Sequence, residues 1–135
     1  MHAWTANWDA AGYGGDNQGV AEGRVLTLDV GGALEFRAQG DPKGKAFGVR
    51  VGELDALRTD PDNPHAMRLF GPIGHDELRD AIEVVARIPE AALRATVAAY
   101  GGSEALADKL VARKSDLARR WSSLGRTGIQ DLRSN

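Results

Sequence analysis

The hydrophobic period of the chain changes near residue 73, and this change limits the folds available to it. Before it, apolar and polar residues alternate in several places, which is typical of strands with one buried face. After it, apolar residues recur every three or four positions, which is typical of amphipathic helices. At 135 residues the chain has the size of one ordinary domain. We therefore predict an α+β fold in a single domain covering residues 1–135.

The first part of the chain, residues 1–73, is predicted to be mainly β, with a small antiparallel sheet within residues 3–70. A three-residue loop, Gly31–Ala33, would pair Val30 with Leu34 and keep apolar side chains on one face. Residues 53–59 remain ambiguous between helix and strand. The predicted strands cover Trp4–Trp8, Leu26–Val30, Leu34–Ala38, Phe47–Val51 and a short stretch at Met67–Phe70.

The second part, residues 74–125, is predicted to be helical, and residues 126–135 would form a C-terminal tail. The expected helices span about 75–87, 89–100 and 103–124, the last being long and amphipathic. Apolar side chains predicted to face the core from the first two helices are Leu78, Ile82, Val85, Leu93, Val97 and Tyr100.

Start and stop signals separate these helices. Pro89 cannot continue a helix but suits the first position of the next one. Gly101 and Gly102 are typical of a left-handed C-cap, and Ser103 is a typical N-cap. The last helix is therefore predicted to begin directly after Ser103.

One apolar stripe would run along the last helix if it is unbroken. At 100° per residue, Leu106, Leu110, Leu117, Trp121 and Leu124 fall within about 60° of one another. The helix would be about 33 Å long, longer than a small sheet can cover, so that part of it could project. A stripe this narrow is typical of a seam for another helix, although packing only within the chain is the simpler alternative.

Cations flank this stripe, and we expect Asp116 to pair with Arg120 four residues on. The main hypothesis is a non-catalytic interaction or assembly protein, which binds a protein partner or a second copy of itself through helix 103–124. Large apolar side chains would anchor the contact and Arg113 and Arg120 would set its orientation. The predicted partner-binding residues are Leu106, Leu110, Arg113, Leu117, Arg120, Trp121 and Leu124.

A DNA-binding regulator is the alternative hypothesis. Residues 103–122 resemble the helix-turn-helix of phage repressor-type regulators, with Leu106 and Ala107 at its apolar and small positions. The resemblance implies a recognition helix in the major groove, where Lys114, Arg119 and Arg120 would meet phosphates or bases. The turn position, usually glycine, is occupied by Val111, which resists the left-handed backbone needed there. The sequence therefore favours one continuous helix.

Several chemistries find no support in the sequence. There are no cysteines, and the three histidines (His2, His65 and His75) lack the spacing of a metal site. The serines lack the contexts of known nucleophile motifs, and the glycine-rich stretch at residues 12–19 precedes a strand, unlike a phosphate loop. We therefore predict no catalytic, cofactor-binding or metal-binding residues, no enzyme activity and no cofactor.

The overall charge argues against a nucleic-acid or membrane partner for the chain as a whole. The formal net charge is -2, and no stretch is long and apolar enough to be a membrane span. Residues 103–135 are locally basic, with 7 Lys and Arg against 4 Asp and Glu. We expect a cytoplasmic protein without membrane contact, in which Trp4 and Trp8 belong to the core.

Overall fold

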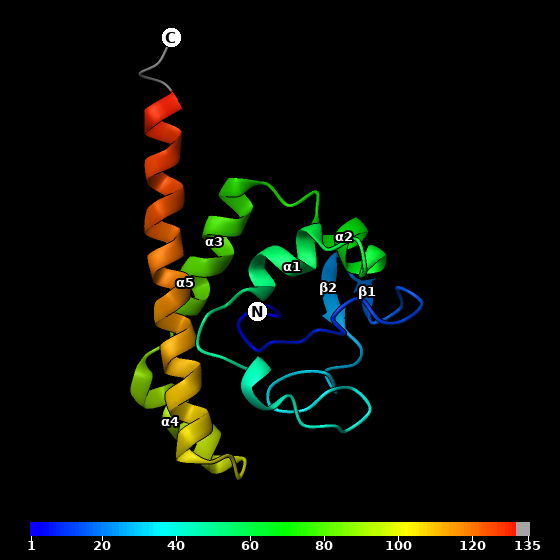
Figure 1. Cartoon of the computed structure of the whole chain (residues 1–135), viewed down its shortest axis with the longest axis vertical. Coiled ribbons are helices and arrows are strands. Elements are labelled where there is room, and N and C mark those ends of the chain that lie inside the picture. The colour runs from blue at the N-terminus through cyan, green and yellow to red at the C-terminus, as the bar shows by residue number, and fades with distance from the viewer. Residues whose placement is uncertain (132–135) are drawn as a thin grey trace. The chain divides into compact units, whose positions relative to one another are not determined.

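The computed structural model describes the backbone of residues 1–131, with the side chains up to Arg120 and that of Ser122. The chain forms two compact units, Met1–Ile73 and Gly74–Asn135, whose ribbons are drawn in Figure 1. The described residues form two strands, a short 3-10 helix and five α-helices. The α+β class is therefore confirmed, but the chain contains less sheet and more helix than the sequence predicts.

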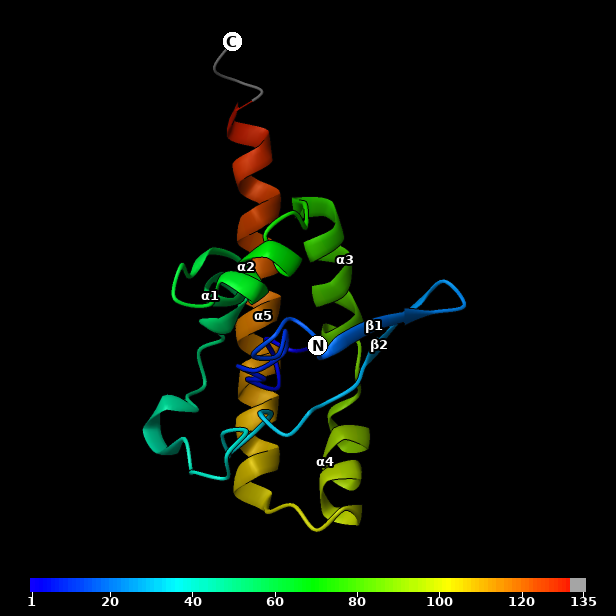
Figure 2. The ribbon, with the colours of Figure 1, turned by 90° about the vertical axis from the view of Figure 1, so that its right-hand side faces the viewer.

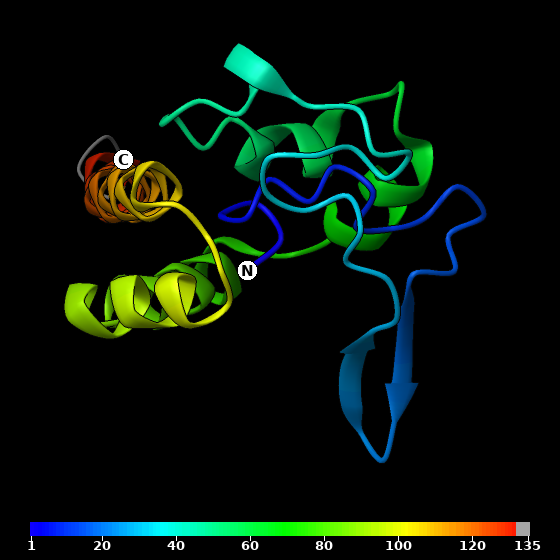
Figure 3. The same ribbon diagram turned by 90° about the horizontal axis from the view of Figure 1, so that it is seen from below.

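The sheet of the described residues is one antiparallel hairpin of β1 (Gln18–Ala21) and β2 (Arg24–Thr27). Val20 pairs with Val25, and both are largely exposed, at 75% and 73%. The turn residues Glu22 and Gly23 have φ of 53° and 74°. A two-residue turn with positive φ at both positions has a backbone twist that matches that of the paired strands. Figure 3 shows the hairpin projecting from the helices of its own unit.

The predicted sheet within residues 3–70 is otherwise wrong. Trp4–Trp8 forms turns, in which Ala6 has φ of 52° and the Asn7 amide donates to the His2 carbonyl oxygen. Local turns need no hydrophobic periodicity, so the alternation of Trp4, Ala6 and Trp8 with polar residues arises here by chance. The loop at Gly31–Ala33 joins no strands, because Leu34, the residue that follows it, lies in another turn and has φ of 60°.

The ambiguous residues 53–59 form a short helix, α1 (Glu53–Thr59), and a second helix, α2 (Pro64–Phe70), replaces the expected strand at Met67–Phe70. Asn63 caps α2, because its side chain accepts a hydrogen bond from the Ala66 amide at 3.2 Å, and Pro64 follows it in the first turn. The stretch Phe47–Val51 also lacks strand structure and follows a 3-10 helix at Gly44–Ala46. The core cluster of this unit consists of Ala10, Ala11, Leu57 and Ala66, with Ala3 and Phe70 packed against it.

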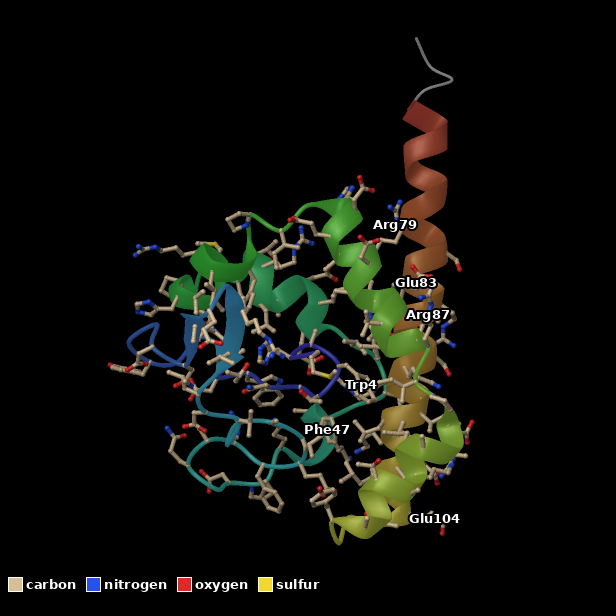
Figure 4. All side chains as sticks on the ribbon, turned by 180° about the vertical axis from the view of Figure 1, so that it is seen from behind. Trp4, Phe47, Arg79, Glu83, Arg87 and Glu104 are labelled. Carbon is tan, nitrogen blue, oxygen red and sulfur yellow. The ribbon has the colours of Figure 1, made fainter. Side chains whose placement is uncertain are left out.

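The C-terminal unit begins with α3 (His75–Ala86) and α4 (Glu90–Ala99). The predicted core residues of α3 (Leu78, Ile82 and Val85) and Leu93 of α4 are buried. Tyr100, a predicted core residue, is instead 89% exposed, because α4 ends at Ala99 and Tyr100 lies in the turn that follows. Figure 4 shows Arg79 and Glu83 on α3 and Arg87 just after its end, and Glu83 and Arg87 form an ion pair.

The last helix, α5, runs without a break from Glu104 to Asp131. Ser103 caps it by accepting a hydrogen bond from the Leu106 amide at 3.1 Å. The expected end near Leu124 is wrong, and α5 includes residues 126–131 of the predicted tail. It contacts both α3 and α4, and Figures 1 and 2 show its C-terminal end extending past α3.

Candidate functional site

The predicted interface leucines lie in the interior of the structure. Leu106, Leu110 and Leu117 are 8%, 4% and 2% exposed, on a helix that contacts α3 and α4. Each leucine that leaves water in this way contributes about 1.5–3 kcal/mol to folding. In the first four turns of α5 the apolar stripe is therefore buried, and this part offers little apolar surface to a partner.

The two arginines predicted at the rim of the interface differ in their surroundings. Arg113 is fully buried. Arg120 is half-buried, and its Nε donates to Asp116 Oδ2 at 3.2 Å, so that the expected ion pair is present. Arg119 reaches the other oxygen of the same carboxylate at 3.1 Å. Asp116 therefore holds two of the three cations that the DNA-binding hypothesis requires.

The third of those cations, Lys114, is also engaged. Its Nζ donates to the backbone oxygen of Ile88 at 2.6 Å, in the turn between α3 and α4. In addition, the helix is continuous across residues 110–114, where a helix-turn-helix would break. The geometry required by the resemblance to phage repressors is therefore absent from this part of the chain.

The side chains of Trp121 and Leu124, the remaining predicted contact residues, lie outside the described part of the structure. Their backbone is helical, as in all of α5 up to Asp131. The spacing of 100° per residue that places them on the same face as Leu117 therefore applies, because all three positions belong to one helix. The site prediction at these two positions stays a prediction.

The N-terminal unit contains a buried lysine that the sequence did not point out. Lys43 is 4% exposed, and its Nζ donates to the carbonyl oxygens of Ala6, Gly32 and Leu34 at 2.7, 2.7 and 2.8 Å. An ammonium group has three N–H donors, and here all three are used. The lysine therefore ties three turns of an irregular segment together, and its nitrogen is not available as a nucleophile.

Trp8 lies against this lysine. The Lys43 nitrogen is 4.7 Å from the centroid of its ring, and the Arg37 guanidinium carbon is 5.0 Å from it. The indole N–H donates to Glu53 Oε1 at 3.1 Å, and Glu53 is itself 8% exposed. Trp8 thus combines cation–π contacts with a partly buried hydrogen bond. Trp8 is half-buried and Trp4 is buried.

His2 lies in the middle of a series of polar side chains in the same unit. Its Nδ1 lies 3.4 Å from Asn7 Nδ2, and its Nε2 lies 3.3 Å from the Thr27 hydroxyl. Burial lowers the pKa of His2, the positive amino group of Met1 lowers it further, and a hydrogen bond with Gln18 opposes both effects. The lowered pKa favours a neutral imidazole in the folded chain.

Other chemistry receives no support from the described residues. Among them, no three His, Asp or Glu side chains gather as a metal ion would require. None of the helices in the described part of the chain is both long and apolar enough to cross a membrane. A shallow pocket between α4 and α5 is lined in part by Arg94, which is already bound by Glu90 and Asp108 at 2.9 and 2.7 Å.

The chain was compared with family models, curated proteins and solved structures, and none of them matches it.

Proposed function

We propose that this protein is a non-catalytic, cytoplasmic assembly protein, which pairs with a second copy of itself through the C-terminal end of α5. The observation that carries this proposal is the length of α5 relative to its neighbours. At 1.5 Å per residue, its 28 residues span about 42 Å, whereas the 12 residues of α3 and the 10 residues of α4 span about 18 and 15 Å. Figure 2 shows the end of α5 beyond the start of α3.

The composition of this helix end supports a helical partner. Trp121 and Leu124 continue, by sequence phase, the stripe that is buried nearer the start of α5. Gly125 and Gly128 each cost a helix about 1 kcal/mol relative to alanine. A helix end of this kind gains most of its stability from packing against another element rather than from propensity.

The charge of the same segment supports a second copy as the partner. Residues 121–131 contain one cation, Arg126, and one anion, Asp131, so that two such segments meet without net repulsion. A two-fold pair is the commonest symmetric assembly, and it lets one apolar patch cover an identical one. The DNA-binding alternative is less well supported, because Lys114, Arg119 and Arg120 already have partners within the chain.

Sedimentation equilibrium of the full chain tests this proposal. We expect a dimer that becomes a monomer in a Trp121→Asp, Leu124→Asp double variant. A Ser122→Asp variant is the matched control, because it adds a charge between the two positions at an exposed residue and should stay dimeric. Circular dichroism checks that all three proteins remain helical.

Two results would overturn the proposal. One is a wild-type protein that stays monomeric at the highest attainable concentration. The other is binding to random duplex DNA with a steep salt dependence, because this would favour the nucleic-acid alternative.

A further inference from the structure

His2 joins four elements of the N-terminal unit. Asn7 approaches it from the N-terminal segment, and Thr27 approaches it from β2. Gln18 of β1 is linked to it through the Thr27 hydroxyl, and the Phe70 ring of α2 lies 5.9 Å from its ring. The charged group that acts on it is the Met1 amino group. The imidazole thus connects the N-terminal segment to the base of the β1–β2 hairpin.

The hydrogen bonds that link Asn7, His2, Thr27 and Gln18 have one consistent direction. The Asn7 amide N–H group faces His2 Nδ1, so Nδ1 must accept and the imidazole proton must be on Nε2. Nε2–H then donates to the Thr27 hydroxyl, which in turn donates to Gln18 Oε1 at 3.2 Å. Gln18 Nε2 completes the chain by donating to the Ala10 carbonyl oxygen at 2.6 Å.

A second proton on the imidazole conflicts with this arrangement. It would place an N–H on Nδ1 opposite the N–H group of Asn7, and two donors cannot bond to each other. The imidazolium would also be close to the positive Met1 amino group. Asn7 Oδ1 is buried without a hydrogen-bond partner. The Asn7 side-chain amide therefore has an unsatisfied acceptor even while His2 is neutral.

We propose that His2 is a pH-sensitive latch, which bridges Asn7 and Thr27 when neutral and leaves this position when protonated. Its departure removes the link between the N-terminal segment and Thr27 at the base of the hairpin. The hairpin carries three exposed apolar side chains, those of Val20, Val25 and Leu26. Acidification would therefore loosen an apolar projection of the molecule.

The alternative outcome is a rotation of the Asn7 amide. A half turn would bring Oδ1 to Nδ1–H, and the protonated imidazole could then stay in place. An Asn7→Asp variant imitates this state permanently, because a carboxylate presents an acceptor in either orientation. In this variant the new ion pair should raise the His2 titration midpoint by about one unit or more.

NMR of the full chain at a series of pH values tests the latch. We expect the neutral His2 to carry its proton on Nε2, as the nitrogen chemical shifts would show. Contacts from its ring to the Thr27 methyl group and the Phe70 ring should be present at neutral pH and disappear as the second proton binds. In Asn7→Asp they should persist through the titration of His2.

A His2→Gln variant is the control for the hairpin itself. It cannot titrate, so the signals of Val20 and Val25 should no longer depend on pH over the range in which His2 titrates. The latch is overturned if the wild-type ring contacts survive protonation, if the neutral proton is on Nδ1, or if the hairpin of His2→Gln still responds to pH.

Discussion

The Lys43 ammonium lies 4.7 Å from the centre of the Trp8 ring and donates to three backbone carbonyl oxygens. The hydrogen bonds connect three turns that make no ladder with one another, since the sheet of the described residues is limited to β1 and β2. In an irregular segment, such side-chain bonds take the place of secondary structure in satisfying buried carbonyl groups. Lys43 is therefore a structural centre of the N-terminal unit.

Replacing this lysine should destabilise the unit strongly. Lys43→Met keeps the aliphatic stem but leaves the carbonyl oxygens of Ala6, Gly32 and Leu34 without their donor, and each unsatisfied group costs about 1–3 kcal/mol. We expect a loss of about 3 kcal/mol or more in the free energy of unfolding, measured with urea. Lys45→Met, at an exposed neighbour, should change it by less than about 0.5 kcal/mol. Equal effects of the two variants would contradict this role.

A separate prediction concerns Gly23 in the hairpin turn. Gly23 has φ of 74° with open space around it, so Gly23→Ala meets no clash but forces alanine into the left-handed region. We expect a cost of about 1–2 kcal/mol. Gly52→Ala is the matched control, because Gly52 is equally open but has φ of -64°, and it should be neutral or stabilising by about 0.4–1 kcal/mol. Thermal unfolding of both variants measures the difference, and identical shifts would rule out backbone strain as the cause.

The continuity of α5 can be tested at Val111. Val111→Pro removes a helix hydrogen bond and brings the proline ring against a carbonyl group one turn earlier, at a cost of about 3 kcal/mol or more. Val111→Ala keeps the backbone intact and should cost clearly less. Guanidinium unfolding of the two variants distinguishes a continuous helix from a turn, because a turn would tolerate the proline about as well as the alanine.

The lowered pKa of His2 also predicts how stability depends on pH. Below the ordinary value of 6.5, the unfolded chain binds a proton that the folded chain binds only at lower pH. The contribution of His2 to stability is thus complete above pH 6.5 and is lost as the pH falls through the folded-state pKa. Urea unfolding at several pH values should show this slope.

The His2→Gln variant separates this effect from that of the N-terminal amine. Burial lowers the pKa of the Met1 amino group below 8.0, which acts in the same direction but at higher pH. A slope below pH 6.5 that is unchanged in His2→Gln would contradict the assignment.

The helices of the C-terminal unit could be predicted because their signals are local. Gly101 has φ of 78°, Ser103 caps the following helix, and Ile82 and Val85 are buried, as expected. Such signals depend on the chemistry of one helical turn and need no knowledge of distant contacts. Tyr100 was misplaced because a stripe pattern does not show where a helix ends.

The N-terminal unit was predicted poorly for a different physical reason. Its turns are held by Lys43, and one lysine among seventeen cationic residues gives no sequence signal that it is buried. One element could have been found, because Asn63 followed by Pro64 is a typical helix start, with a cap and a proline in the first turn. The positive φ of Leu34 could not have been expected for a branched side chain.

The partner-binding site on α5 stays a prediction. The phase of Leu106, Leu110 and Leu117 along one helix was visible, but a stripe does not show whether it faces its own chain or another. Pairing of α5 between two copies remains the central proposal. The chain has no cysteine, so a single label can be attached at an introduced thiol.

A spin label at Ser122→Cys, with the inter-label distance measured by pulsed electron resonance, tests this pairing most directly. Ser122 is exposed in its own chain, and two packed helices have axes about 8–10 Å apart. We predict a short and well-defined distance between labels on two copies, which disappears on dilution with unlabelled protein. A signal without any specific distance between copies, in a protein that is otherwise folded, would contradict the proposal.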